Sequence, residues 1–227
     1  NTSQLDKAFG CLGKMCSFRN ISVTSCPNFS TAALDAIDLP MLQGLTLSQC
    51  LKVKTLDFLS NCRVLSSLVL EKIPIPDSNA LSALSTLPLT QIGVGILKEF
   101  DVATLGGCNH LKSLTLKNIG TLKGVGQLNP SVESLTVEGC ADFCTCDIPK
   151  DHKLMRLRLV EVSTANTLVF VSQLKHLTQL ELQAMKECTF GTNEIFGLTA
   201  CSSLKSLFIK DVPEFTQDVR TTIIGEM

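Results

Sequence analysis

Residues 111–119 read LKSLTLKNI, and this nine-residue phrase decides the fold because it recurs along most of the chain. Its apolar residues occupy positions 1, 4, 6 and 9, here Leu111, Leu114, Leu116 and Ile119. The same spacing occurs nine times, and the copies begin at Phe18, Leu42, Leu65, Leu89, Leu111, Val132, Leu154, Leu177 and Leu204. Successive copies start 21 to 27 residues apart. A period of about 20–50 residues indicates a stacked-repeat architecture.

In each copy the apolar positions 4 and 6 alternate with position 5, which does not belong to the apolar set, as in Leu114-Thr115-Leu116. This alternation is typical of a short strand with one buried face. Each strand follows the last after a return segment of similar length, so neighbouring strands must pair in parallel. The predicted fold class is an α/β solenoid: a parallel sheet lines the concave side of an arc, and short irregular helices and loops form the convex side.

The return segments should supply the opposite wall of the core. Residues 31–37 and 77–84 are candidate short helices, because Ser, Thr or Asp stands at each start as a possible N-cap. The Gly-rich segment 120–128 is expected to lack a regular helix. The apolar candidates on this wall are Leu34, Ile37, Val53, Leu59, Leu81, Leu84, Phe100, Leu105, Leu122, Val125, Phe143, Ile148, Leu168, Val171, Phe190, Phe196 and Phe215.

The predicted organisation is one array of nine repeats over residues 18–212. Residues 1–17 are expected to form an N-terminal flank or a degenerate repeat, and residues 213–227 a C-terminal flank. Because the array shows no recognisable polar caps, and stacked repeats need covered ends for solubility, we expect the chain to be part of a larger chain or complex.

The repeated phrase resembles the leucine-rich-repeat family, in which L-x-x-L-x-L-x-x-N/C opens each unit. Cysteines recur at position 9 (Cys26, Cys50, Cys140) and three residues before position 1 (Cys62, Cys108, Cys201). This placement resembles the cysteine-containing intracellular subclass of that family. The resemblance implies that position-9 cysteines face inward and bond to neighbouring backbone groups.

Five of the eleven cysteines lie outside these places: Cys11, Cys16, Cys144, Cys146 and Cys188. Cys140, Cys144 and Cys146, with His152 nearby, lack the C-x-x-C spacing usual for zinc, so no metal is predicted. A Cys144–Cys146 disulfide is sterically poor if the chain is extended there. Reduced thiols and an intracellular location, cytoplasmic or organellar, are therefore expected.

Composition argues against several function classes. The net charge is −1 and no Lys/Arg run occurs, so direct nucleic-acid binding is not expected. No apolar stretch reaches the roughly 18 residues of a membrane span, so no membrane contact is predicted. Phosphate-binding loops and nucleophile motifs are missing, and His110 and His176 each directly precede position 1 as turn residues. The chain is predicted not to be an enzyme and to use no cofactor.

The concave face is expected to differ between the two halves of the array. At positions 3 and 5, repeats one to six present small neutral side chains, whereas the later repeats present larger ones. The candidate protein-binding residues are Arg156, Arg158, Glu181, Lys205, Phe208 and Lys210. Arg and Phe suit the centre of an interface, so a partner docked there would centre on Arg158 and Phe208. Three neighbouring pairs should neutralise each other: Lys112 with Glu133, Lys117 with Glu138, and Arg158 with Glu181.

The function expected from these features is a non-enzymatic scaffold that binds protein partners. Three alternatives stay open: a structural subunit of a large ribonucleoprotein or organellar assembly, a substrate-recognition arm of a ubiquitin ligase, and a surface receptor ectodomain of a protist. The ligase role rests on the family resemblance alone, since no F-box-like helical segment is present in the sequence.

Overall fold

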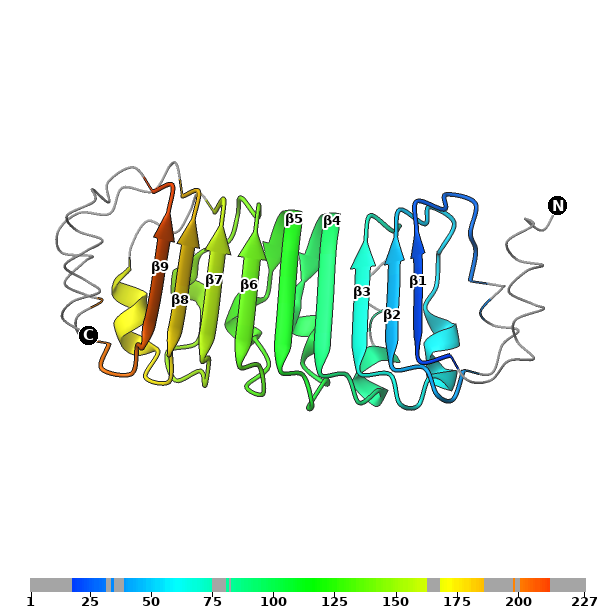
Figure 1. Cartoon of the computed structure of the whole chain (residues 1–227), viewed down its shortest axis with the longest axis horizontal. Helices are drawn as coiled ribbons and strands as arrows, with labels where there is room; N and C mark the ends of the chain where they lie inside the picture. Colours follow the sequence, from blue (N-terminus) through cyan, green and yellow to red (C-terminus); the bar gives the residue numbers. More distant parts are fainter. Residues whose placement is uncertain are drawn as a thin grey trace.

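The computed structural model describes residues 18–31, 34, 39–74, 81, 83–162, 168–185, 198 and 201–212. In this part of the chain, nine parallel strands form one open sheet in sequence order (Figure 1). The strands are β1 (Asn20–Thr24), β2 (Gly44–Ser48), β3 (Ser67–Glu71), β4 (Gln91–Asp101), β5 (Ser113–Lys123), β6 (Ser134–Glu138), β7 (Arg156–Val160), β8 (Gln179–Gln183) and β9 (Ser206–Lys210). The predicted α/β solenoid with a parallel sheet is confirmed.

Equivalent motif positions pair across every strand boundary. Leu68 of β3, Ile92 of β4 and Leu114 of β5 are register partners, and the same one-repeat offset holds from β1 to β9. The rows predicted for positions 3 and 5 are therefore correct. Because the side-chain period of a strand is two, this register sends all position-4 and position-6 side chains to one face.

That inward face forms one continuous apolar core. Side chains at positions 1, 4, 6 and 9 are buried except for six half-buried ones: Phe18, Ile21, Cys26, Leu97, Leu207 and Ile209. Five of these six belong to the first or last described repeat, which has a repeat neighbour on one side only. Leu114, in the middle of the array, is fully buried.

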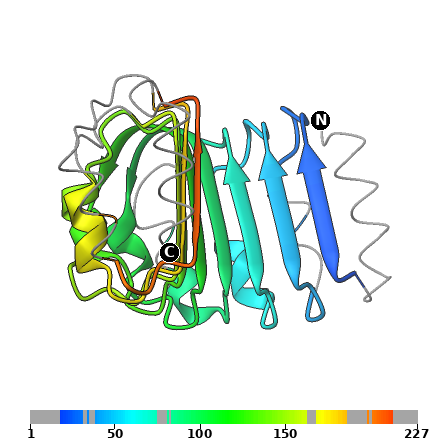
Figure 2. The ribbon, with the colours of Figure 1, turned by 60° about the vertical axis from the view of Figure 1, so that its left-hand side comes forward.

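The wall opposite the sheet is built from short 3₁₀ helices and loops (Figure 2). The helices are η1 (Asp57–Asn61), η2 (Ala83–Thr86), η3 (Val102–Leu105), η4 (Val125–Gln127), η5 (Thr145–Asp147) and η6 (Val169–Gln173). All predicted apolar residues of this wall that are described are buried. Ile37, Phe190, Phe196 and Phe215 lie outside the described residues, as does most of the candidate helices 31–37 and 77–84.

Strands β4 and β5 are 11 residues long, whereas the other seven have five. After position 8 they pair again, with Leu97 opposite Ile119 and Phe100 opposite Leu122. Residues 120–128, which were expected to lack a regular helix, continue β5 as far as Lys123 and then form the three-residue 3₁₀ helix η4. Asp101 ends β4, and its Oδ1 accepts a 2.9 Å hydrogen bond from the amide of Ala103 at the start of η3. Both 11-residue strands thus continue from the sheet towards the opposite wall (Figure 2).

Position 8 of every repeat adopts a left-handed backbone conformation. The residues are Ser25, Gln49, Lys72, Ile96, Asn118, Gly139, Glu161, Ala184 and Asp211, with φ between 48° and 63°. The turn lets the position-8 amide pair with the next repeat, as when the Glu161 amide donates to the Gln183 carbonyl at 3.0 Å. Only Gly139 adopts this conformation without steric cost. Ile96 is the least suited to it, because β-branched residues rarely have positive φ.

Within the described residues, no helix is long and apolar enough to cross a membrane. The predicted flanks, residues 1–17 and 213–227, lie outside the described residues.

Candidate protein-binding face

Positions 3, 5 and 7 of each strand project from the sheet away from the core and form the concave face. From β1 to β6 its central row consists of small or medium uncharged residues: Ser22, Thr46, Val69, Gly93, Thr115 and Thr136. From β7 to β9 the same row contains Arg158, Glu181 and Phe208. The predicted contrast between the two halves of the array is confirmed for this row.

The row of Arg158, Glu181 and Phe208 is hereafter called the C-terminal row. Arg158 Nε donates to Glu181 Oε1 at 2.7 Å, and Arg158 Nη2 donates to Gln183 Oε1 at 3.3 Å. Both side chains of the ion pair remain partly exposed, at 40% for Arg158 and 33% for Glu181. Phe208 is the register partner of Glu181 on the other side. The guanidinium is therefore already bound within the face, and Phe208 lies on the strand next to Glu181.

Phe208 is 49% exposed and is the exposed aromatic residue among the described side chains. An exposed aromatic ring leaves a large apolar area in contact with water, and burying such an area is the main favourable term in association. The ring lies on the concave face, and its register partner is the charged residue Glu181. This combination makes Phe208 the strongest candidate anchor on the face.

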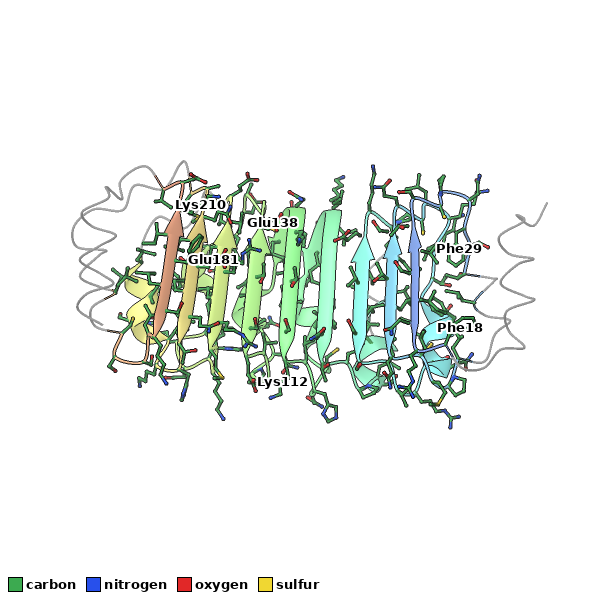
Figure 3. All side chains as sticks on the ribbon, in the orientation of Figure 1. Phe18, Phe29, Lys112, Glu138, Glu181 and Lys210 are labelled. Carbon is green, nitrogen blue, oxygen red and sulfur yellow. The ribbon has the colours of Figure 1, made fainter. Side chains whose placement is uncertain are left out.

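The other candidate residues do not all join this row. Arg156 is exposed at position 3 of β7, opposite Gln179. Lys205 precedes β9, and Lys210 ends it. Figure 3 shows Lys210 near the carboxyl end of its strand and Glu181 in the middle of β8. The five residues of β9 span about 16 Å, so the two lysines lie at opposite rims of the face.

All three predicted cross-strand ion pairs form. Besides the pair in the C-terminal row, Lys117 Nζ lies 3.3 Å from Glu138 Oε2, and Lys112 Nζ lies 2.5 Å from Glu133 Oε1. The latter pair lies at the amino-terminal rim of the sheet (Figure 3). Because these side chains are partly exposed, each pair contributes about 0–1 kcal/mol. Their main effect is to neutralise charge on the face.

A feature that the sequence reasoning missed is a hollow in the concave face over β3, β4 and β5. Its volume is about 270 Å³. The polar or charged side chains around it include Ser67, Glu71, Gln91, Ser113, Thr115 and Lys117. The hollow exists because position 5 of β4 is Gly93, which has no side chain to fill the space between its neighbours. Glycine at positions 5 and 7 of a single repeat is the signal that identifies it.

The position-9 cysteines behave as the family resemblance implies. Cys50 Sγ donates to the carbonyls of Val23 and Ser48, and Cys140 Sγ donates to those of Leu116 and Glu138. Burial raises the thiol pKa of Cys50, Cys108, Cys140 and Cys201. A raised pKa keeps the thiol protonated, which disfavours both nucleophilic attack and metal ligation.

Cys144 does not fit the expectation of reduced thiols, because it is disulfide-bonded. The second cysteine of this bond lies outside the described side chains. The backbone is extended at Cys144 itself but not after it, since Thr145–Asp147 forms the 3₁₀ helix η5. The six cysteines at recurring motif places form no disulfide bond. Cys144 therefore does not share the packing role of the six cysteines at recurring motif places.

His152 and Asn129 form a buried polar contact that the sequence reasoning also missed. His152 Nε2 lies 3.0 Å from the carbonyl oxygen of Asn129, and burial lowers the His152 pKa. The Asn129 side-chain amide donates to the carbonyls of Leu105, Gly106 and Cys108 in the preceding repeat. These bonds join three successive repeats on the wall opposite the sheet. His110 and His176 are exposed, as expected for turn residues.

Comparisons with known proteins identify the fold. No family model matches the chain, and neither does any curated protein. Among solved structures, an internalin from Listeria monocytogenes aligns over 96% of this chain and 62% of its own, with 17% identity and a TM-score of 0.65. A leucine-rich-repeat protein from Leptospira interrogans aligns over 100% and 62%, with 15% identity and a TM-score of 0.57.

Internalin C2 from Listeria monocytogenes aligns over 96% of this chain and 90% of its own, with 15% identity and a TM-score of 0.52. The chain thus spans less than two thirds of the length of two of these three structures. At such identities the similarity concerns the fold alone. Together with nine strands in register and a repeated L-x-x-L-x-L phrase, it shows that this chain has the leucine-rich-repeat fold.

Proposed function

We propose that the chain is a non-enzymatic scaffold that binds a protein partner on its concave face, with the contact centred on the C-terminal row of Arg158, Glu181 and Phe208. The observation that carries this proposal is the half-exposed Phe208 ring beside an ion pair at the centre of the last three strands. Aromatic and arginine side chains are the types most often found at energetic centres of interfaces.

The contributions of the two anchors should differ. A partner can bury the solvent-exposed apolar area of Phe208, and this burial needs no group of opposite charge on the partner. Arg158 is held by Glu181 at 2.7 Å, so it gains less from a new contact but orients the carboxylate beside the ring. Burying an aromatic side chain at the centre of an interface contributes about 2 kcal/mol or more. Phe208 should therefore account for most of the loss when both residues are replaced.

The test is affinity capture followed by mass spectrometry, repeated with variants of matched fold. Arg158→Ala with Phe208→Ala should keep the fold, because both side chains project away from the core. The same double variant should lose the principal partner. Thr46→Ala with Thr136→Ala, at the same motif position in β2 and β6 and outside the hollow, should retain it. If the threonine pair loses the partner and the other pair does not, the contact lies over the amino-terminal repeats and the placement is wrong. The partners captured also discriminate between an assembly subunit and a ligase arm.

A surface receptor ectodomain is a second candidate, favoured by the disulfide at Cys144. Structural disulfides persist mainly in oxidising compartments. The intracellular alternative requires this cysteine to be reduced in the cell. Alkylation of freshly released protein under denaturing, non-reducing conditions distinguishes the two: a blocked Cys144 supports the ectodomain, and a fully alkylated Cys144 supports the intracellular scaffold.

A further inference from the structure

The hollow over β3, β4 and β5 has a floor of backbone and walls of polar side chains. Gly93 of β4 forms the floor, and Gly95 lies two residues further along the same strand. A Cβ atom at Gly95 would lie 3.3 Å from both Glu71 Cγ and Lys117 Cβ. The Glu71 and Lys117 side chains therefore flank this glycine from the two neighbouring strands. A side chain on β4 would occupy the space that the glycines leave open.

The two charged walls of the hollow are not equivalent. Lys117 is paired with Glu138, whose Oε2 is 3.3 Å from Lys117 Nζ. Glu71 forms no ion pair with any described residue, and its Oε2 has a long contact of 3.5 Å with Ser48 Oγ. Within the described part of the chain, Glu71 is thus the carboxylate of the hollow that has no ion-pair partner. Around it, Ser67, Gln91, Ser113 and Thr115 add side chains able to accept hydrogen bonds.

The size of the hollow selects the kind of occupant. Pockets for drug-sized ligands and cofactors have volumes of about 300–1,000 Å³, whereas this hollow has about 270 Å³ and opens to solvent. A single long side chain fits such a site better than a whole small molecule. A guanidinium group matches a carboxylate and several hydroxyl or amide acceptors, because its five donors lie in one plane.

We propose that this hollow receives an arginine side chain from the protein partner. The proposal rests on the proposed function, since it assumes a partner on the concave face, and it specifies the chemistry of that partner. Five strand spacings of about 4.8 Å separate β4 from β9, or about 24 Å. A standard interface of about 800 Å² per partner is roughly 28 Å across. One partner can therefore cover the hollow and Phe208 together.

Ile96 lies close to the hollow along β4, although it is not one of its lining residues. It directly follows Gly95, has a φ of 54°, and is 47% exposed. A β-branched residue in this conformation is unfavourable for the fold, and exposure of its side chain brings no core packing in return. The left-handed turn itself recurs at position 8 of every repeat, so only the exposed β-branched side chain is particular to this repeat. A partner segment that places an arginine in the hollow would have this exposed apolar side chain nearby on the same strand.

The proposal is tested by nuclear magnetic resonance titration of the ¹⁵N-labelled protein with the capped tripeptide acetyl-Gly-Arg-Gly-amide. The amide signals of Gly93 and Gly95 should shift with the arginine peptide and not with the same peptide containing citrulline, which is the uncharged isostere. Glu71→Gln should weaken binding by about two- to fivefold, the range for a partly exposed ion pair. Glu99→Gln, the same change on β4 outside the hollow, should leave the affinity unchanged.

Three results would overturn the proposal: no shift at Gly93 and Gly95, equal shifts with the citrulline peptide, or shifts that Glu71→Gln leaves unchanged. A folded Gly93→Val variant, which fills the hollow, should also lose the shifts. The peptide experiment involves neither Phe208 nor the natural partner. Failure at the hollow with retained dependence of partner capture on Phe208 would therefore refute this inference alone, and the reverse outcome would refute the proposed function alone.

Discussion

The two faces of the one sheet follow different rules. On the inward face, positions 4 and 6 are Leu, Ile or Val in every repeat, and all but three of these residues are buried. On the concave face the same strands present residues as different as Gly93, Arg158 and Phe208 at one motif position. The inward positions must pack on identical neighbours, whereas the concave positions meet solvent or a partner. Positions with the same residue type in every repeat therefore contribute stability, and positions whose residue type varies between repeats are the candidates for recognition.

The largest effect should follow a substitution on the inward face. Leu114→Ala removes a fully buried side chain from the central repeat and should lower the free energy of unfolding by about 2–5 kcal/mol, since a cavity remains. Because stacked repeats stabilise each other, the loss should spread along the array. Urea unfolding measures it, and Thr115→Ala on the other face is the matched control. A loss below about 1 kcal/mol for Leu114→Ala would contradict the inward assignment.

A smaller effect is expected where the two faces meet, at motif position 8. Ile96→Gly should raise the free energy of unfolding by about 1 kcal/mol, because glycine relieves the left-handed strain. Gly139→Ala should lower it by a similar amount or more, since its Cβ would overlap the Asn118 side chain. Thermal unfolding of both variants checks the opposite signs. If Ile96→Gly destabilises the fold, Ile96 contributes packing and cannot be assigned to recognition.

The smallest effect concerns pH and the buried His152 on the opposite wall. Burial lowers its pKa from the ordinary 6.5, so below that pH the unfolded state binds a proton that the folded state does not. The free energy of unfolding should therefore decrease as the pH falls below about 6.5. The decrease should be shallower for His152→Gln, which does not titrate and retains a donor. His110→Gln, at an exposed site, should keep the wild-type slope, and equal slopes for all three proteins would refute the assignment.

The sequence was sufficient to predict the strands, their register and nearly the whole core. Nine repetitions of one spacing constrain these features, since any shift of register would expose Leu114 and its equivalents. The long strands β4 and β5 could not be predicted, because residues 97–101 and 119–123 pair only with each other. The buried contact between Asn129 and His152 was also missed, since it joins return segments that have no common motif.

The candidate site was predictable in part. Register alone places Arg158, Glu181 and Phe208 in one row, and the opposite charges of the first two correctly predict their ion pair. The selection of large or charged side chains also groups Lys205 and Lys210 with them, although these two lysines lie at opposite rims. The hollow at Gly93 was missed because a search for large side chains ignores the positions where a side chain is absent.

The most direct test of the division between the two faces is Phe208→Ala, measured for both stability and partner affinity. We expect the free energy of unfolding to stay within about 0.5 kcal/mol of wild type, while isothermal titration shows partner affinity reduced by about 2 kcal/mol. The opposite result, a clear loss of stability with unchanged affinity of the folded protein, would contradict the assignment of the concave face to recognition.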